Sequence, residues 1–595
     1  MNYNLNELQK KEKKPFFQEL KGLVDAAGGE QRNLVVALAI MLLNTALNLS
    51  GPLLVGYTID HYIQTKQFDG VLLFSAILLA LYVMVFGGSY LQTNLMGSAA
   101  QRIVFGLRNA VFYKIQALPI AFFNQNKAGD LISRVNSDTD RLNQFFSQGL
   151  LQFVSSIFML AASGTFMLII NFKLGVVTVL PALCIWLFVN RLSPWVRKRN
   201  AANLESVGMM SGEIQESLNN FKIVVAFNRR DYFRKRFNTV NQQNYKTAIG
   251  AGIANTVFMP VFSLFSNIAQ LLLLVYGVYL IHEASLSVGL MISFFAYANS
   301  FYNPIRQLAT LWTSFQTALA SWDRISQMLG LSNDLEVVEY GIAPGSIELQ
   351  NSEDAGKGIL EFREVHFGYP GSKEILHNIS FRLEPGKMYA FVGPTGGGKT
   401  TTASLMARLY DPLSGFVLLN GRDIRSYTPD ERASKIGFIL QEPLLFTGTV
   451  RDNILYGNER YAGLDDAAFM KVIEEAGLGE LLAVFDKGLE TEVAAGGTSM
   501  SLGQKQLIAF MRAFLRKPEL LILDEATANI DTITEQMLGR ILDKLPSETT
   551  LVIIAHRLNT IENADEIFFV NSGEVVRAGS FKDAVEKLMK GKRES

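Results

Sequence analysis

The sequence predicts a polytopic α-helical membrane domain, with six transmembrane helices and long cytoplasmic extensions, followed by an α/β domain of the P-loop class. Three observations predict this organisation. Long apolar runs are confined to the first half of the chain. From about residue 357, short β-rich runs alternate with helical ones, as in a parallel sheet covered by helices. A glycine-rich segment lies between one such strand and the helix that follows it.

Composition supports a chain that is partly membrane and partly water-soluble. The 595 residues exceed one ordinary domain, and 49% are apolar, yet the chain has 55 basic and 55 acidic residues. The zero net charge argues against nucleic acid as the main partner. Cys184 is the single cysteine, so a disulfide within the chain is impossible, and we expect no redox or zinc role for it. The N-terminus "MNYNLNELQKKEKK" has no apolar core, so we expect no signal peptide and a cytoplasmic segment over residues 1–30.

Six apolar runs are each long enough to cross a hydrocarbon core of about 30 Å. They lie at about 33–60, 70–96, 147–170, 174–196, 252–281 and 285–315. Any one of them could be the buried helix of a soluble protein, but six runs with consistent charge flanks favour a membrane domain over residues 31–325.

The connections between the runs differ in length and charge. Two loops of about fifty residues carry sixteen Lys and Arg, whereas the short connections carry only Lys66 and Lys173. Because positive charge is retained on the cytoplasmic side, we expect the long loops and both termini in the cytoplasm. The apolar spacing within these loops predicts helices that continue out of the membrane.

After a linker predicted over residues 326–356, the domain over residues 357–595 contains "MYAFVGPTGGGKTTTASLMARLY". This is a strand, a glycine loop and a helix in order, which is the pattern of a phosphate loop. Backbone N–H groups of such a loop surround phosphate oxygens, a lysine reaches the terminal phosphates, and a hydroxyl ligates Mg²⁺. The alternative is a turn without ligand. The residues concerned are Gly393, Pro394, Thr395, Gly396, Gly397, Gly398, Lys399, Thr400 and Thr401.

Further along the chain, "LLILDEATANID" is an apolar strand that ends in Asp524 and Glu525. A buried strand with paired acids at its end can direct one carboxylate toward a metal and the other toward an attacking water, as phosphoanhydride hydrolysis requires. A helix N-terminus capped by acids is the alternative for a single pair. Its position in a phosphate-loop domain favours the hydrolytic interpretation.

These motifs, with "GFILQEPLLF", "MSLGQ" and "IIAHRL", resemble in order and spacing those of ATP-binding-cassette (ABC) ATPases. In the membrane half, residues 122–142 and 303–325 closely resemble ABC exporter sequences. The resemblance extends from about residue 15 to 585. The chain is thus identified as a half-transporter, one membrane domain fused to one ATPase domain, and we expect it in a bacterial inner membrane.

The resemblance implies roles for single residues and two bound species, ATP and Mg²⁺. Tyr369 would stack on adenine, although a lone tyrosine is more often packed in a strand. Asp524 would hold the metal, and Glu525 would be the general base. The other implied contacts are Gln441 to Mg²⁺, the attacking water and the membrane domain, His556 to the γ-phosphate, and Asp531 to nucleotide. We expect structural roles for His61, His282, His366 and His377.

In this family the signature motif closes over nucleotide held by the phosphate loop of a second ATPase domain, so a half-transporter must dimerise. Here Ser501, Gly503 and Gln504 match the motif, but Leu502 replaces a glycine. A side chain there would obstruct approach to the γ-phosphate and restrict φ. Three residues depart from the family pattern elsewhere, namely Ala495, Asn529 and Ile530. A complete hydrolytic set beside an altered signature predicts one half of a heterodimer, and a homodimer that tolerates Leu502 is the alternative.

The function predicted from the resemblance is ATP-driven export by alternating access. The loops near Asp130 to Asp140 and Phe221 to Phe227 would transmit closure of the ATPase domains to the membrane helices. Helices that are rich in aromatic residues and nearly free of central charge suit an apolar or amphipathic cargo, drug-like or lipid-like, within the bilayer. A non-pumping ATP-gated regulator and an importer's ATPase are the alternatives; intact Glu525 argues against the first and the fused membrane domain against the second.

Overall fold

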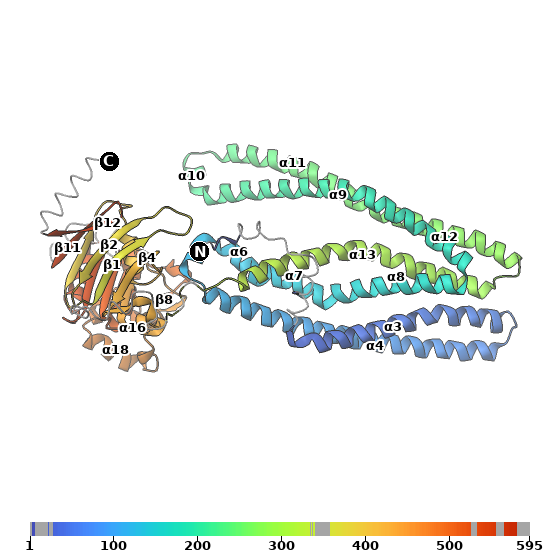
Figure 1. Ribbon diagram of the computed structural model, residues 1–595, viewed down its shortest axis with the longest axis horizontal. Coiled ribbons are helices and arrows are strands. Elements are labelled where there is room, and N and C mark those ends of the chain that lie inside the picture. Colours follow the sequence, from blue (N-terminus) through green and yellow to red (C-terminus); the bar gives the residue numbers. More distant parts are fainter. Residues whose placement is uncertain are drawn as a thin grey trace. The chain divides into compact units, whose positions relative to one another are not determined.

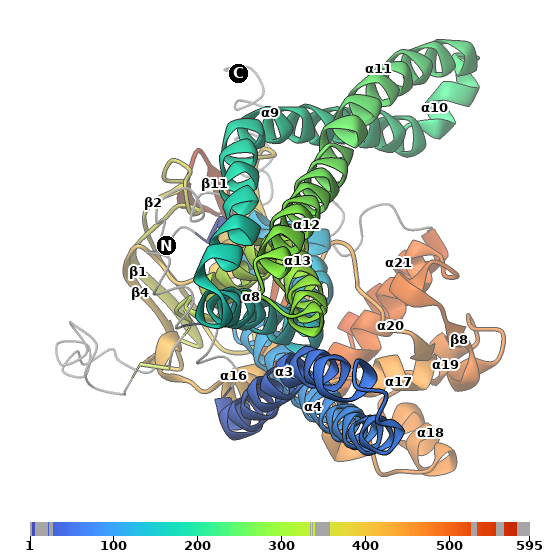
Figure 2. The same ribbon diagram turned by 90° about the vertical axis from the view of Figure 1, so that its right-hand side faces the viewer.

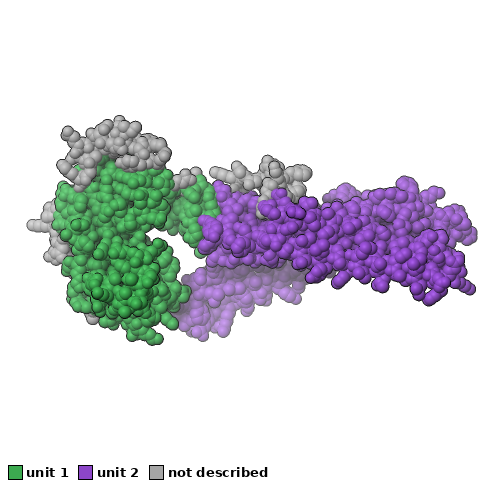
Figure 3. All heavy atoms as spheres, turned by 90° about the horizontal axis from the view of Figure 1, so that it is seen from below, with its two compact units in different colours: residues 1–8, 114–128, 331–595 green, residues 9–113, 129–330 purple. Residues whose placement is uncertain are grey.

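The structure is a computed structural model that describes residues 3–5, 22, 28–333, 335, 337–338, 358–524, 532–554 and 564–579. The chain divides into two compact units (Figure 3). One unit contains Met1–Leu8, Lys114–Ala128 and Leu331–Ser595, and the other contains Gln9–Tyr113 and Gly129–Gly330. The first unit therefore includes a short segment of the helical half as well as the α/β part of the chain.

The second unit is built from long helices (Figure 1). Its longer helices are α3 (Gln31–Thr58), α4 (Phe68–Gln116), α8 (Leu150–Ile170), α9 (Phe172–Asn219), α11 (Arg230–Thr256), α12 (Phe258–His282) and α13 (Val288–Leu329), with α4 ending in the first unit. Shorter segments are α5 (Ile120–Gln125), which belongs to the first unit, and α6 (Ala128–Ser133), η3 (Arg134–Asp138), α7 (Thr139–Gln144) and α10 (Phe221–Ala226).

Several of these helices are much longer than a membrane is thick. Helix α9 has 48 residues, which at 1.5 Å per residue is about 72 Å, more than twice the hydrocarbon thickness. Helices α9 and α11 pack along each other, and α10 joins them at one end (Figures 1 and 2). The predicted helical extensions beyond the membrane are therefore confirmed.

Among the described residues, five helical segments are long and apolar enough to cross a membrane. They are Gly28–Ile63, Phe68–Gln116, Ala128–Ile170, Phe172–Asn219 and Arg230–His282. The sixth apolar run of the sequence lies in α13, which is not one of the five. The count of six spanning helices thus stays a prediction, and α13 differs from the others in its polarity.

Helix α13 is central to the packing of its unit, since it contacts α3, α8 and α12. Two buried tyrosines anchor it through hydroxyl groups that donate to backbone carbonyls. Tyr297 donates to the Leu49 oxygen at 2.6 Å, and Tyr302 donates to the Thr178 oxygen at 2.7 Å. Each polar group is therefore satisfied within an apolar cluster, as burial requires.

The α/β part contains two main sheets. A mostly parallel sheet has the strand order β12-β11-β3-β10-β9-β6, and an antiparallel sheet has the order β2-β1-β4-β5. The bounds of the strands in these two sheets are β1 (Leu360–Phe367), β2 (Leu376–Leu383), β3 (Met388–Val392), β4 (Ser414–Leu419), β5 (Arg422–Asp423), β6 (Ile436–Ile439), β9 (Leu520–Asp524), β10 (Thr550–Ile554), β11 (Glu566–Asn571) and β12 (Glu574–Gly579). A small pair is formed by β7 (Gly448–Thr449) and β8 (Glu492–Val493).

Helices complete the two hydrophobic clusters of this part. One cluster joins both main sheets and α15, and the other lies among strands of the parallel sheet, α17, α18, α20 and α21. The helices are α15 (Lys399–Met406), α16 (Pro429–Lys435), α17 (Val450–Leu455), α18 (Asp466–Glu475), α19 (Gly479–Leu482), α20 (Leu502–Leu515) and α21 (Thr532–Leu542). The α/β class predicted from the sequence is confirmed, with an added antiparallel sheet.

Strand order determines where the predicted site forms. Strand β10 pairs in parallel with β3 on one side and β9 on the other, so that Ile554 is level with Phe391 and Asp524. Since the carboxyl ends of parallel strands meet at one edge of a sheet, the loop after β3 and the acid that ends β9 lie at the same edge.

Candidate functional site

The phosphate loop follows β3 and requires glycine at its first position. Gly393 has φ +153°, and a Cβ added there would lie 1.9 Å from the carbonyl oxygen of Val570. Gly398, the last residue before α15, has φ +113°, a conformation that side chains rarely adopt. The neighbouring strand β11 therefore packs so closely against the loop that no side chain fits at Gly393 or Gly397.

Lys399 and Thr400 open α15 at the predicted phosphate-contacting position. Lys399 is 5% exposed, and its Nζ donates to the carbonyl oxygens of Gly393 and Pro394 at 2.9 and 3.0 Å. The ammonium group is thus held against the loop that is predicted to bind phosphate. Thr400 is exposed, and its hydroxyl donates to Oδ1 of Asp524 at 3.2 Å.

The hydroxyl of Thr400 and the carboxylate of Asp524 fit a magnesium ion. Both are hard oxygen ligands, and adjacent ligands of an octahedral Mg²⁺ lie about 3 Å apart, close to their separation of 3.2 Å. Asp524 is 3% exposed, so its carboxylate is held in place by burial. These two residues come together from positions 124 apart in the sequence.

The other loop residues divide by exposure. Thr395 and Gly396 are exposed, whereas Gly397 and Thr401 are buried. The hydroxyl groups of Thr401 and Tyr369 lie 3.2 Å apart. The tyrosine predicted to stack on adenine therefore lies beside the start of α15, as that role requires.

Tyr369 is half-buried within a cluster of aromatic rings that sequence reasoning missed in part. Its ring packs edge-on against Phe367 and Tyr410, with centroids 5.1 Å away in each case. Tyr410 accepts a hydrogen bond from the side-chain amide of Asn124 in α5 at 2.7 Å, and burial raises the pKa of the Tyr410 hydroxyl. The aromatic residue in "ARLYDP", at the exit of the phosphate-loop helix, was the available signal.

Of the remaining members of the predicted hydrolytic set, only Gln441 lies within the described residues. Gln441 follows β6 and is exposed. Glu525, Asp531 and His556 lie outside the described residues, as do Asn529 and Ile530. Strands β9 and β10 end at Asp524 and Ile554, immediately before those segments. The roles assigned to Gln441, Glu525, Asp531 and His556 stay predictions.

The signature segment forms the start of α20. Ser501 caps this helix by accepting from the Gln504 backbone N–H at 3.2 Å, and the Gln504 side chain accepts from the Ser501 N–H at 2.9 Å. Ser501 is exposed, whereas Gly503 is buried. This reciprocal capping is a common way to stabilise a helix N-terminus, and it leaves the serine at the surface.

Leu502 is the first residue of α20 and does not have positive φ. Its side chain is partly buried and packs against the hydrophobic cluster that contains α17, α18 and α20. The restriction that leucine places on φ therefore causes no strain here, since the position is helical. Steric obstruction of a partner's nucleotide stays a prediction. Ala495, the other departure in this segment, is exposed.

The loop near Asp130 to Asp140 contains a buried charge cluster that the sequence analysis did not identify. Arg134 is fully buried and donates to Asp130 at 3.1 Å and to the carbonyl of Arg324 at 2.5 Å. Arg324, near the end of α13, pairs with Asp130 and with Asp138 at 2.5 and 3.2 Å. The acid–base–acid repeat at intervals of four in "DLISRVNSD" was a local signal, but its partner in α13 was not visible in the sequence.

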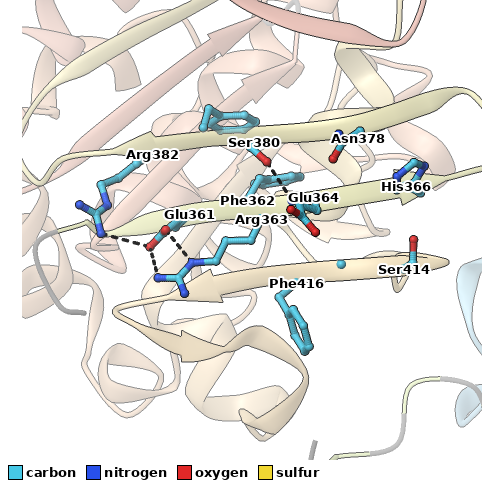
Figure 4. Close-up of a pocket in the computed structure, with 12 residues that line it drawn as sticks. Glu361, Phe362, Arg363, Glu364, His366, Asn378, Ser380, Arg382, Ser414 and Phe416 are labelled. Carbon is cyan, nitrogen blue, oxygen red and sulfur yellow. Dashed lines mark hydrogen bonds and ion pairs between the residues drawn. The ribbon is translucent and has the colours of Figure 1, made fainter. Parts of the chain in front are cut away.

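An open hollow of 1080 Å³ lies over the antiparallel sheet and contains none of the predicted site residues (Figure 4). Three of its charged side chains pair with one another. Glu361 lies 2.7 Å from Arg363 and 3.4 Å from Arg382. This hollow therefore plays no part in the site predicted from the sequence.

Comparisons with known proteins agree over nearly the whole chain. The family described as "ABC transporter transmembrane region" matches residues 34–305, and "ABC transporter" matches residues 376–528. An uncharacterized ABC transporter ATP-binding protein of Bacillus subtilis is 30% identical over 564 residues, which cover 94% of this chain and 91% of that protein.

Two further relatives have names that state a cargo. A fatty acid ABC transporter ATP-binding/permease protein of Mycobacterium tuberculosis is 31% identical over 86% of this chain and 79% of its own length. A multidrug resistance ABC transporter ATP-binding and permease protein of Lactococcus lactis is 30% identical over 95% and 92%. A bacterial Atm1-family ABC exporter with ATP bound has the same fold, with a TM-score of 0.76, 23% identity, and coverage of 95% of this chain and 98% of that one.

Proposed function

Because the chain belongs to the ABC transporter family, we propose that it is one half of an exporter for apolar or amphipathic small molecules, drug-like or lipid-like. It is an integral membrane protein that couples ATP hydrolysis to transport. The observation that carries the proposal is the convergence of Lys399, Thr400 and Asp524 at one sheet edge, in a chain that also has long apolar helices. Relatives named for fatty acids and for multidrug resistance support the class of cargo.

In the proposed site, the residues divide the work of holding and cleaving ATP. The loop from Gly393 to Gly398 binds phosphate oxygens through backbone N–H groups, and Lys399 neutralises the terminal phosphates. Thr400 and Asp524 would hold Mg²⁺, since their oxygen atoms lie 3.2 Å apart. When bound, Mg²⁺ supplies positive charge that offsets the charge developing on the phosphate oxygens. Glu525 takes a proton from the attacking water, and His556 contacts the γ-phosphate and orients Glu525. Gln441 would link Mg²⁺ and the attacking water to the membrane domain, and Asp531 contacts nucleotide. Tyr369 stacks on adenine.

The partner is proposed to be a different half-transporter. Ser501, Gly503 and Gln504 would close over the partner's ATP, and Leu502 would obstruct that approach. A partner with a glycine at the matching position would complete the site formed by this chain's phosphate loop. A second copy of this chain is the alternative, and the helical geometry at Leu502 is compatible with it.

Helix α10 supports the proposed transmission of closure. Its apolar side chains are exposed in this chain, including Phe221 at 52%, Ile223 at 58% and the following Phe227 at 74%. Apolar side chains at the tip of a cytoplasmic helical pair need a covering surface, which we assign to a second ATPase domain. ATP then drives the membrane helices only through its preference for the closed arrangement.

We place the chain in a bacterial inner membrane, with its N-terminus and ATPase domain in the cytoplasm. The relatives named above are bacterial, and the basic residues of the long loops follow the pattern of cytoplasmic loops. We propose boundaries of 31–325 for the membrane domain and 357–595 for the ATPase domain, with a linker over 326–356 and an N-terminal segment over 1–30.

The experiment that tests the proposal is purification of the full chain in lipid, with measurement of its oligomeric state and Mg-ATP hydrolysis. A Glu525→Gln variant should bind ATP normally but hydrolyse it about 10²- to 10⁴-fold more slowly. Glu519→Gln is a matched control, since this acid precedes the same strand and pairs with Lys435. Near-normal hydrolysis by Glu525→Gln would refute the general base.

The partner is decided by the same preparation. An inactive chain that becomes active only when a second half-transporter is added supports the heterodimer. A dimer of this chain alone with robust, Glu525-dependent turnover establishes the homodimer instead. Absence of hydrolysis with any partner would overturn the pumping function and favour a regulator.

A further inference from the structure

One face of α13 is exposed in this chain and changes character along its length. The exposed or half-buried positions recur every three or four residues, which places them on one side of the helix. Its outer part is apolar and its inner part is polar. The positions in order are Val288, Ile292, Phe295, Asn299, Asn303, Arg306, Thr310 and Thr313. We call this face the α13 stripe.

The polar part of the α13 stripe is unsuited to contact with lipid tails. Asn299 accepts a hydrogen bond at 3.0 Å from Gln270 of α12, so two amide side chains occur together on neighbouring membrane helices. Unsatisfied polar groups in hydrocarbon cost several kcal/mol, and such residues therefore face water or protein. Helix α13 is also absent from the five described segments that are apolar enough to span. The stripe thus faces a space that contains water, cargo or a second chain.

Arg306 is the one charged residue of the α13 stripe. It lies 18 residues after the start of α13 at Val288, about 27 Å along the axis, and so near the cytoplasmic boundary of a membrane about 30 Å thick. Its guanidinium donates to the side-chain oxygen of Asn303 at 3.2 Å. Within the described part of the chain, no carboxylate forms an ion pair with it, so its charge is open to an anion.

Arg191 is a second arginine near the membrane boundary in the same unit, but its neighbours are apolar. It lies 19 residues after the start of α9 at Phe172, about 28 Å along the axis and therefore at a similar depth. Its exposed neighbours one turn away are Leu187, Pro194 and Trp195. An arginine on an apolar surface extends to the lipid headgroups, whereas Arg306 lies among amides and hydroxyls.

We propose that Arg306 binds the anionic headgroup of a single-chain amphiphile that enters from the inner leaflet. The carboxylate or phosphate headgroup pairs with the guanidinium and with Asn303, because charge-assisted hydrogen bonds are the strongest contacts available on the stripe. The tail extends toward the outer, apolar part of the stripe at Phe295, Ile292 and Val288. The direction of polarity along α13 therefore matches an amphiphile with its head at the inner boundary. This proposal rests on the exporter function proposed above and specifies its cargo.

Binding is tested without ATP, on the full chain in vesicles of uncharged phosphatidylcholine. The probes are a fluorescent medium-chain fatty acid, the phosphate ester of the same chain, and the uncharged alcohol of the same chain, followed by anisotropy. Wild-type protein should bind the two anionic probes about 10- to 100-fold more tightly than the alcohol. Arg306→Gln should abolish this preference, and Arg306→Lys should retain most of it.

The matched control is Arg191→Gln, which should keep the preference because Arg191 is at the same depth but off the stripe. Equal loss in both arginine variants would attribute the effect to boundary charge and overturn the proposal. Equal binding of all three probes by wild-type protein would also overturn it, and this comparison needs no variant to fold. A preference for the fatty acid over the phosphate ester, or the reverse, identifies the headgroup.

Two further outcomes separate this proposal from others. If Arg306→Gln breaks the dimer, as followed by crosslinking, while the wild-type protein shows no preference, the stripe is a subunit interface and the proposal fails. If wild-type protein binds the anionic probes selectively but neither hydrolyses nor exports, the exporter function fails and the binding site stands. If ATP drives export of the alcohol and the fatty acid at equal rates, and Arg306→Gln does not change these rates, the exporter function stands and the proposed headgroup site fails.

Discussion

The phosphate loop (393–398) and the signature segment (498–504) are both expected to contact nucleotide, yet they are built into the fold in different ways. The phosphate loop is enclosed by its own chain, because Val570 approaches Gly393 so closely that no Cβ fits. The signature segment ends in an exposed, capped helix start, where Leu502 is accommodated without strain. Packing within the chain therefore dictates glycine at position 393, whereas the helical conformation at position 502 accepts leucine as well as glycine.

The largest effect is expected for Gly393→Ala, which tests whether packing fixes the phosphate loop. The added Cβ would lie 1.9 Å from the Val570 oxygen, so the backbone must shift. Strain of about 3 kcal/mol corresponds to roughly 100-fold weaker ATP binding, measured by equilibrium binding of a fluorescent ATP analogue. Gly371→Ala is the control, since it also has positive φ, +80°, but has nothing within 4 Å of an added Cβ. Similar losses in both variants would show that φ, and not the contact with Val570, is decisive.

A smaller effect is expected for Leu502→Gly. This substitution tests whether the leucine side chain obstructs nucleotide that is bound by a second ATPase domain. Glycine removes a partly buried side chain from a helix, so the thermal midpoint should fall by a few degrees, as expected for about 1 kcal/mol. If leucine obstructs nucleotide in a homodimer, Mg-ATP hydrolysis should rise about tenfold, equivalent to roughly 1.4 kcal/mol. Leu502→Ala separates the two effects, because it removes bulk and keeps helix propensity. A fall in stability with unchanged hydrolysis would contradict the obstruction.

The smallest effect is expected for Tyr410→Phe, which tests a contact within the unit that holds the phosphate loop. The substitution keeps the ring that packs on Tyr369 and removes the hydroxyl that accepts from Asn124. Loss of one such hydrogen bond should lower cargo-stimulated hydrolysis by roughly two- to tenfold and leave ATP affinity unchanged. The measurement is hydrolysis in vesicles with and without cargo.

Asn124→Ala should reproduce the effect of Tyr410→Phe, and the double variant should be no worse than either single one. Additive losses would show that the two residues act separately. A change in ATP affinity would indicate that the hydroxyl supports the position of Tyr369 instead.

Some residues of the site could be predicted from the sequence, and others could not. Lys399 and Thr400 were identifiable because their motif is contiguous and its backbone conformation is local. Asp524 was identifiable as an acid at a strand end, but its 3.2 Å contact with Thr400 depends on strand order. Tyr410 and Asn124 were missed because they are 286 residues apart, and no local pattern links them.

In the membrane half, too, continuous patterns were predicted and contacts between distant segments were not. The apolar runs predicted its long helices, because burial in hydrocarbon requires continuous apolar sequence. The cluster of Arg134 with Asp130, Asp138 and Arg324 was not predicted, because it joins a loop to the end of α13. Asn299 and Arg306 lay in a run read as apolar, and their shared face became visible only when the opposite face of α13 was seen to be buried.

The sequence by itself determined the class of protein, the contiguous motif of the phosphate loop with its lysine, and the long helices, since each is a pattern of neighbours along the chain. Only the tertiary structure decided which strand end carries Asp524 to Thr400, that Leu502 is helical and partly packed, and which side of α13 is left for a ligand. These features depend on packing between distant segments, and the free energy of burial and pairing acts on distances in space, not on separation in sequence.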